Sequence, residues 1–214
     1  MKIRLLSLLL SVLPVGFAFA QGFTRQDTLR GSLSSIRSCY DVTHYDLRVQ
    51  VNPSTQSIEG SNTIRYRATT DFHRMQVDLF ANLAVTAITQ QGKPVKFTRE
   101  GNAMFLELPR PESKGREGSI RIDYRGKPTV GKNPPWDGGF TWQKDKSGKE
   151  WVTVSCEGVG ASLWWPCKDH LTDEPDSMRI RLVVPNGLMA VANGNLRTRR
   201  PLRNGCTEFD WRVS

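Results

Sequence analysis

The stretch Tyr45-Asp46-Leu47-Arg48-Val49-Gln50-Val51 alternates apolar and polar side chains at every position. Successive side chains of a β-strand point to opposite faces of a sheet, so this alternation predicts a strand with one buried face and one solvated face. The following Asn52-Pro53-Ser54 contains residue types that favour turns, and it predicts the end of the strand. The stretch therefore indicates a sheet that covers a core on one side only.

The same two-residue alternation recurs along most of the chain, between short segments rich in Gly, Pro and Asn. It occurs in residues 58–66, 75–79, 83–89, 95–98, 104–108, 120–124, 178–184 and 209–213. Strands that recur at short intervals with such turns are typical of antiparallel all-β domains. We find no apolar stripe with helical spacing after residue 20. The sequence therefore predicts an all-β fold over residues 39–214, an antiparallel saddle-like or sandwich domain.

Residues 1–20 have the composition of a cleavable signal peptide. Lys2 and Arg4 precede a short apolar run at residues 5–17, and Ala18-Phe19-Ala20 matches a cleavage site. The alternative is a buried N-terminal helix, which is disfavoured because nothing amphipathic follows the run. We therefore expect export of the protein, to the periplasm or by secretion, with cleavage after Ala20.

Further predictions concern the two ends of the β-domain and its relation to membranes. Residues 21–38, rich in Ser, Thr, Arg and Gly, are expected to form a short N-terminal lead. The last residues, Trp211-Arg212-Val213-Ser214, lie within an alternating stretch, so we expect a β-domain that is truncated at its C-terminal end. No segment after residue 20 contains the ~18 consecutive apolar residues of a transmembrane helix, so no membrane span is expected.

The chain carries 30 basic and 21 acidic residues, a formal net charge of +9. Such a balance raises the possibility of nucleic-acid binding. The basic residues are scattered, however, and only residues 197–203 form a small local group. A cationic surface on an exported protein explains this distribution better than a nucleic-acid partner, and no nucleic-acid-binding motif is present.

The four cysteines are Cys39, Cys156, Cys167 and Cys206. An even count in an exported protein permits disulfides, with three fully paired connectivities, and Cys156 with Cys167 is the pair to test first. The alternative is that both are reduced, buried thiols. No C-x-x-C spacing occurs, so a structural zinc site is not expected.

Residues 126–150 form a long excursion rich in Gly and Pro between two strands. One interpretation is a functional loop whose aromatic side chains pack over a cleft. The other is a β-hairpin with Gly148 in its turn, in which Phe140 and Trp142 cover the sheet. The second interpretation is slightly favoured.

The next segment places an acid and several aromatic side chains among glycines. It reads Ser155-Cys156-Glu157-Gly158-Val159-Gly160 and continues to Trp164-Trp165-Pro166-Cys167-Lys168-Asp169. A core strand does not need this mixture of residues, whereas a loop that lines a substrate site does. A carboxylate held in a cleft attracts an ammonium group and accepts its hydrogen bonds. The competing interpretation of Glu157 is a surface salt bridge at the end of a strand.

The chain contains only three histidines, His44, His73 and His170, and none belongs to H-E-x-x-H. We also find no G-x-S-x-G, P-loop or G-x-G-x-x-G sequence. The sequence therefore predicts no catalytic residue and no metal ligand within these 214 residues.

Several of these motifs, in this order, resemble the N-terminal domain of the aminopeptidase N family of zinc metallopeptidases, which includes leukotriene A4 hydrolase. The resemblance spans residues 39–214. The residues that carry it are 45–51, 58–64 with Gly60, Glu157-Gly158, 164–169, Asp173-Glu174-Pro175-Asp176 and Val184-Pro185-Asn186-Gly187-Leu188.

The resemblance implies the N-terminal portion of an exported zinc aminopeptidase, which removes N-terminal residues from peptides. Zinc would be bound by a catalytic domain of the same parent chain, outside this sequence. Glu157 and Gly158 would bind the substrate by its free amino group. Many family members have Gln where this chain has Ser155. Asp169 and the acids of residues 173–176 would brace the loop.

The resemblance leaves two alternatives in other functional classes. The first is a stand-alone, non-catalytic secreted β-domain that binds peptides or proteins. The second is a module that binds polyanions through its positive charge, for which the expected sign is a steep dependence of binding on salt.

Overall fold

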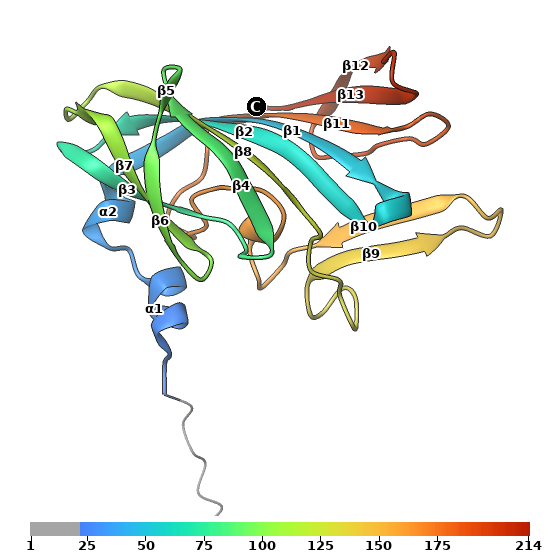
Figure 1. The fold of residues 1–214 in the computed structure, drawn as a ribbon, viewed down its shortest axis with the longest axis horizontal. Helices are drawn as coiled ribbons and strands as arrows, with labels where there is room; N and C mark the ends of the chain where they lie inside the picture. The colour runs from blue at the N-terminus through green and yellow to red at the C-terminus, as the bar shows by residue number, and fades with distance from the viewer. Residues whose placement is uncertain (1–21) are drawn as a thin grey trace, which may run out of the picture.

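The computed structural model describes residues 22–214 (Figure 1). The predicted signal peptide lies outside the described residues. The strands are β1 Tyr40–Asn52, β2 Ser57–Ala68, β3 Phe72–Asp78, β4 Leu83–Gln90, β5 Lys93–Pro94, β6 Lys96–Glu100, β7 Ala103–Glu112, β8 Glu117–Gly126, β9 Gly139–Lys144, β10 Glu150–Ser155, β11 Ser177–Pro185, β12 Asn195–Pro201 and β13 Cys206–Val213. The short helices are α1 Arg25–Gly31, α2 Ser35–Ser38, η1 Pro53–Thr55 and η2 Ala161–Leu163.

The strands form three sheets. The largest has eight strands in the order β12-β13-β11-β1-β2-β8-β4-β5, beside a three-stranded sheet β3-β7-β6 and the hairpin β10-β9. Within residues 22–214 every paired strand runs antiparallel to its neighbour except β1 and β11, which are parallel with His44 opposite Ser177. The all-β prediction is confirmed. The parallel pair was not predicted, because alternation encodes which face is buried and not the direction of the neighbouring strand.

The core lies on the concave side of the large sheet (Figure 1). Tyr45, Leu47 and Val49 of β1 are buried, as the alternation predicts, and they share one cluster with Ile64 of β2 and Ile122 of β8. The three-stranded sheet packs against this cluster. It contributes side chains from both β3 and β7 to the same core: Met75, Val77, Met104 and Leu106. The result is a saddle-like layer of β-structure over a second, smaller layer.

One strand boundary and one whole strand differ from the prediction for identifiable reasons. β1 begins at Tyr40, and a bulge between Val42 and His44 shifts its alternation by one residue. A bulge inserts one extra residue, so residues on both sides of it point into the core although their parity differs. Strand β12 was missed because all its residues are exposed and no apolar alternation marks it.

The N-terminal lead contains two short helices, α1 and α2, which the sequence analysis did not predict. Helix α1 begins with a capping box in which Thr24 and Asp27 bond each other's backbone N–H groups. Only Leu29 of this helix is buried, against Ala103 and Phe105 of β7. A seven-residue helix with one buried side chain has no apolar stripe for sequence analysis to detect.

Residues 139–155 form the hairpin that the second interpretation of the excursion predicted. Phe140 stacks on Trp142 with ring centroids 5.2 Å apart, and both pack against the core of the large sheet. Gly148 lies in the turn with φ +81°, a conformation that favours glycine. In this structure none of the four cysteines forms a disulfide; Cys167 is buried, as the alternative predicted, whereas Cys156 is half-buried. Among the described residues, no helix is long and apolar enough to cross a membrane.

Gly60 of β2 allows a close approach of β1, so its replacement tests the sheet. A Cβ atom at this position would lie 2.2 Å from the Arg48 carbonyl oxygen and 3.0 Å from the Val49 Cα. We expect Gly60→Ala to lower the free energy of unfolding by about 1–3 kcal/mol, because backbone must move to admit the methyl group. Gly31→Ala is the control, since a Cβ there meets nothing within 4 Å. Equal denaturant midpoints for the two variants would contradict this account of Gly60.

Candidate functional site

Glu157 and Gly158 lie in a tight turn directly after β10. This site turn, residues 156–160, is closed by a hydrogen bond of 2.8 Å from the Gly160 N–H to the Cys156 carbonyl oxygen. Gly158 and Gly160 have φ values of +74° and +87°, which explains why glycine occupies both positions. Glu157 and Gly158 are exposed, and no salt bridge within residues 22–214 involves Glu157. The predicted surface salt bridge is therefore not formed, and the carboxylate faces solvent.

Beyond the turn, the chain passes beneath the concave side of the large sheet (Figure 1). This segment, residues 161–176, is the bracing loop. Trp165 is buried and meets the ring of Tyr45 edge-on at 4.9 Å. The Tyr45 hydroxyl accepts a hydrogen bond of 3.1 Å from the Lys168 N–H, and the Asn62 Nδ2 donates to the Pro166 carbonyl at 2.8 Å. Side chains of β1 and β2 thus hold the loop.

Trp164 is half-buried, and it packs edge-on against Phe140 of the hairpin with ring centroids 6.3 Å apart. Both tryptophans therefore contribute packing to the core of the domain. Their aromatic surfaces link the bracing loop to the hairpin and to β1, so the loop is fixed on two sides.

A buried charge pair fixes the bracing loop to β3. The Arg37 Nη2 lies 2.5 Å from the Asp78 Oδ2, and the side chains are 0% and 6% exposed. Asp78 also accepts hydrogen bonds from the Gln76 Nε2 at 2.8 Å and from the Asp169 N–H at 3.1 Å. The backbones of Asp78 and Cys167 exchange two hydrogen bonds, of 2.8 and 3.0 Å. Burial raises the pKa of Asp78, and the charge of Arg37 opposes this increase.

Two of the acids predicted to brace the loop do so. The Asp169 Oδ2 accepts hydrogen bonds from the Ser162 Oγ at 2.5 Å and from the Ser162 N–H at 3.2 Å. A Cβ atom on Gly160 would lie 2.0 Å from that same oxygen. Asp173 pairs with the buried ammonium of Lys168 and accepts a bond of 3.3 Å from the Val42 N–H. Glu174 and Asp176, the other acids of residues 173–176, are exposed.

The described residues do not fit a zinc ion. No group of three or more His, Cys, Asp or Glu side chains within residues 22–214 is placed to hold a metal. The His44 Nδ1 lies 2.8 Å from the Ser177 Oγ, whereas the His170 Nδ1 lies 2.9 Å from the Thr172 Oγ1. His73 is exposed on β3. With the histidines on separate elements, no step of a metal reaction can be assigned to these side chains.

Residues 41–214 match the family model of the peptidase M1 N-terminal domain. The chain belongs to this family. The match confirms the resemblance carried by the motifs, because the matched range contains every one of them. A comparison with curated proteins gave no match.

Solved structures similar to this M1 N-terminal domain include zinc metallopeptidases and a leukotriene A4 hydrolase. One is an M1 zinc metallopeptidase from Deinococcus radiodurans bound to a Tyr-Ser-Ala substrate, at 29% identity and a TM-score of 0.67. The match covers 81% of this chain and 39% of that chain, so this chain spans about two fifths of its relative's length. Leukotriene A4 hydrolase of Saccharomyces cerevisiae matches at 18% identity and a TM-score of 0.61, over 85% of this chain and 28% of that chain, and shows the shared fold.

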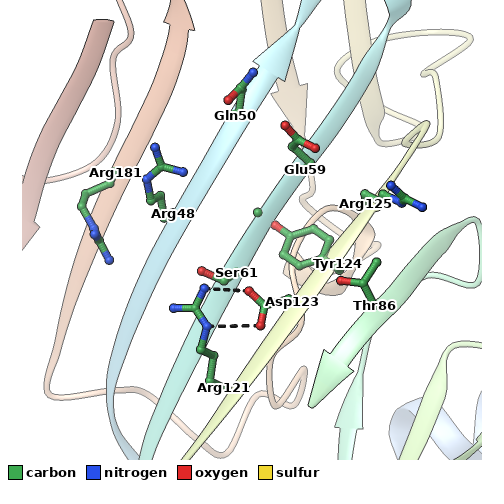
Figure 2. A pocket seen from close by; sticks show the side chains of 11 residues that line it. Arg48, Gln50, Glu59, Ser61, Thr86, Arg121, Asp123, Tyr124, Arg125 and Arg181 are labelled. Atoms are coloured by element: carbon green, nitrogen blue, oxygen red, sulfur yellow. Dashed lines mark hydrogen bonds and ion pairs between the residues drawn. The ribbon is translucent and has the colours of Figure 1, made fainter. Parts of the chain in front are cut away.

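The opposite, convex face of this M1 N-terminal domain carries an open polar depression of about 530 Å³ (Figure 2). Three of the four arginines that line it are paired with acids. Arg121 bonds Asp123 in a bidentate contact, Arg48 pairs with Glu208 at 2.9 Å, and Arg181 pairs with Asp46 at 2.7 Å. Many of the cations are thus neutralised within the sheet. This arrangement argues against a concentrated anion-binding surface, in agreement with the scattered basic residues of the sequence.

The buried pair predicts a pH-dependent effect of losing Arg37. The native state holds a proton on Asp78 more tightly than the unfolded chain does, so loss of that proton as pH rises above the ordinary Asp range costs stability. Arg37→Met removes the charge that limits this cost. We expect it to lower the free energy of unfolding by about 3–5 kcal/mol near neutral pH. The loss should be smaller at about pH 4, because a larger fraction of the Asp78 carboxyl groups is protonated there and less charge is left without a partner.

Denaturant unfolding at several pH values measures this loss. Arg67→Met is the matched control, because Arg67 pairs with Glu117 at 3.4 Å on the exposed face and should contribute less than about 1 kcal/mol. A loss for Arg37→Met that is small and independent of pH would contradict the bracing role of the pair.

Proposed function

We propose that this chain is the N-terminal portion of an exported zinc aminopeptidase, and that Glu157 binds the free α-amino group of the peptide substrate. The observation that carries the proposal is an exposed acid on a glycine turn that is fixed by a buried network, within an M1 N-terminal domain. Zinc and the hydrolytic step belong to a catalytic domain of the same parent chain. The predicted signal peptide directs the enzyme out of the cytoplasm, to the periplasm or the medium.

The geometry of the site turn suits an ammonium ligand. An α-ammonium carries a positive charge and three N–H donors, and a carboxylate satisfies both the charge and the donors. Gly158 contributes space, since a Cβ atom there would meet nothing within 4 Å. Its positive φ also lets the chain turn so that the adjacent carboxylate is presented to solvent. In many family members a Gln stands at the position of Ser155. The side chain of Ser is shorter than that of Gln, so in this chain we expect Glu157 to make more of the contact with the substrate amine.

The ligands of the solved relatives support recognition through the amine. The Deinococcus radiodurans enzyme has been solved with Tyr-Ser-Ala, and related two-domain M1 structures contain L-arginine or L-tryptophan. These ligands differ in side-chain size and charge but share an α-amino group. A carboxylate that binds this common group accounts for a site that accepts all of them.

Removal of the carboxylate tests the role of Glu157. In the enzyme that includes the catalytic domain, we expect Glu157→Gln to lower kcat/KM for peptides by about 100-fold, because the ammonium loses its charged partner. Glu174→Gln, which alters an exposed acid of the bracing loop, should leave kcat/KM within about twofold. An unchanged rate for Glu157→Gln, or an equal loss in both variants, would remove Glu157 from the site.

The proposal places amine binding in this domain and zinc and hydrolysis in a separate catalytic domain. The purified chain and its gene both test this proposal. We expect purified residues 21–214 to release no N-terminal residue from peptides, with or without added zinc, because the histidines here do not form a zinc site. We expect the coding sequence to continue past Ser214 into an H-E-x-x-H motif. Zinc-dependent peptidase activity of the isolated chain, or a stop codon after Ser214, would favour the alternative of a stand-alone binding domain.

A further inference from the structure

An N-terminal strap, residues 24–38, runs from helix α1 through α2 to the start of β1, and it lies outside the residues 41–214 that match the family model. In Figure 1 it descends below the three-stranded sheet. The strap contacts both that sheet and the site turn. It therefore adds contacts to the proposed amine site from a part of the chain that the family match does not include.

One side of α1 is attached to the three-stranded sheet. Arg25 makes two bonds, of 3.0 and 3.1 Å, to the Glu100 carboxylate of β6. Leu29 packs on Ala103 and Phe105, and its carbonyl oxygen accepts a bond of 2.9 Å from the Gln76 Nε2. These contacts fix the position of the helix relative to β3, β6 and β7.

The C-terminal end of α1 reaches the site turn and the bracing loop. The Arg30 Nη2 donates to the Gly158 carbonyl oxygen at 2.5 Å. The His170 Nε2 donates to the Gly31 carbonyl oxygen at 3.2 Å. Adjacent residues of the strap therefore bond the turn that carries Glu157 and the loop that follows it.

Arg37 fixes the strap and the bracing loop together. Its Nη1 donates to the carbonyl oxygens of Arg30 and Ser32, at 2.5 and 3.2 Å, while its Nη2 binds Asp78. Asp78 in turn accepts from the Asp169 N–H. The carbonyl of Arg30 is thus held by a buried guanidinium, and the Arg30 side chain starts from a fixed backbone position when it reaches Gly158.

We propose that Arg30 is a positioning residue for the amine site, which orients Glu157 by holding the Gly158 carbonyl. This inference rests on the proposed function. The site turn contains two glycines with positive φ and an exposed carboxylate, so few contacts of its own limit its motion. A carboxylate that is oriented before the substrate arrives loses less conformational entropy on binding the ammonium. Arg30 therefore affects substrate binding more than it affects the hydrolytic step.

Steady-state kinetics of the enzyme with its catalytic domain test this role. We expect Arg30→Ala to raise KM by about tenfold and to leave kcat within about twofold, as for loss of an interaction made equally in the bound substrate and the transition state. Arg30→Lys should recover part of the lost affinity, because its ammonium can still donate one bond to Gly158. Arg25→Ala is the matched control, since it removes an arginine from the same helix on the side that faces Glu100.

Amide hydrogen exchange on the chain gives a second readout that does not need activity. We expect the amides of residues 157–159 to exchange faster in Arg30→Ala than in Arg25→Ala. Unchanged exchange and an unchanged KM in Arg30→Ala would overturn the proposal, as would equal effects of the two variants. If Glu157→Gln is fully active, the amine site itself is wrong; if Glu157→Gln is impaired and Arg30→Ala is not, only the role of Arg30 fails.

Discussion

The ion pair between Arg37 and Asp78 joins three parts of the chain that are distant in sequence. Two buried charges are costly to remove from water, and further hydrogen bonds to the two groups offset part of this cost. Here Arg37 also binds two carbonyl oxygens of the N-terminal strap, and Asp78 also binds Gln76 and the Asp169 N–H. The pair therefore ties the N-terminal strap, β3 and the bracing loop together, in addition to the contacts that β1 and β2 make with the loop.

The two faces of the large sheet have different roles: one supports the core and the bracing loop, and the other carries paired charges. On the concave face, apolar side chains such as Leu47 and Ile64 supply the core, and polar groups such as the Tyr45 hydroxyl hold the bracing loop. On the convex face, arginines and acids alternate and pair, for example Arg179 with Asp210 at 2.7 Å. Pairing of arginines with acids limits the positive field that this face would otherwise produce. The proposed amine site lies outside the regular strands, in the turn that follows β10.

The alternation of residues 45–51 and of the strands that follow was sufficient to predict the all-β fold and most of its core. It could not predict β12, whose residues are all exposed, or helix α1, which buries one side chain. Glu157 was proposed as a site residue from its setting among glycines and from the resemblance, and the bracing role of Asp169 was predicted from the resemblance. Arg30 and Arg37 were not found, because their partners Gly158 and Asp78 are 128 and 41 residues away. Contacts across such separations leave no local pattern.

A turn built from glycines presents a carboxylate well but orients it poorly, since each glycine widens the set of backbone conformations available. The structure resolves this conflict with contacts made outside the turn. Asp169 holds Ser162 on one side, and Arg30 holds the Gly158 carbonyl on the other. Both contacts are anchored to the same buried pair, because Arg37 binds the Arg30 carbonyl and Asp78 binds the Asp169 N–H. The orientation that we propose for the exposed acid therefore depends on groups outside the turn, whose own positions are set by a buried ion pair.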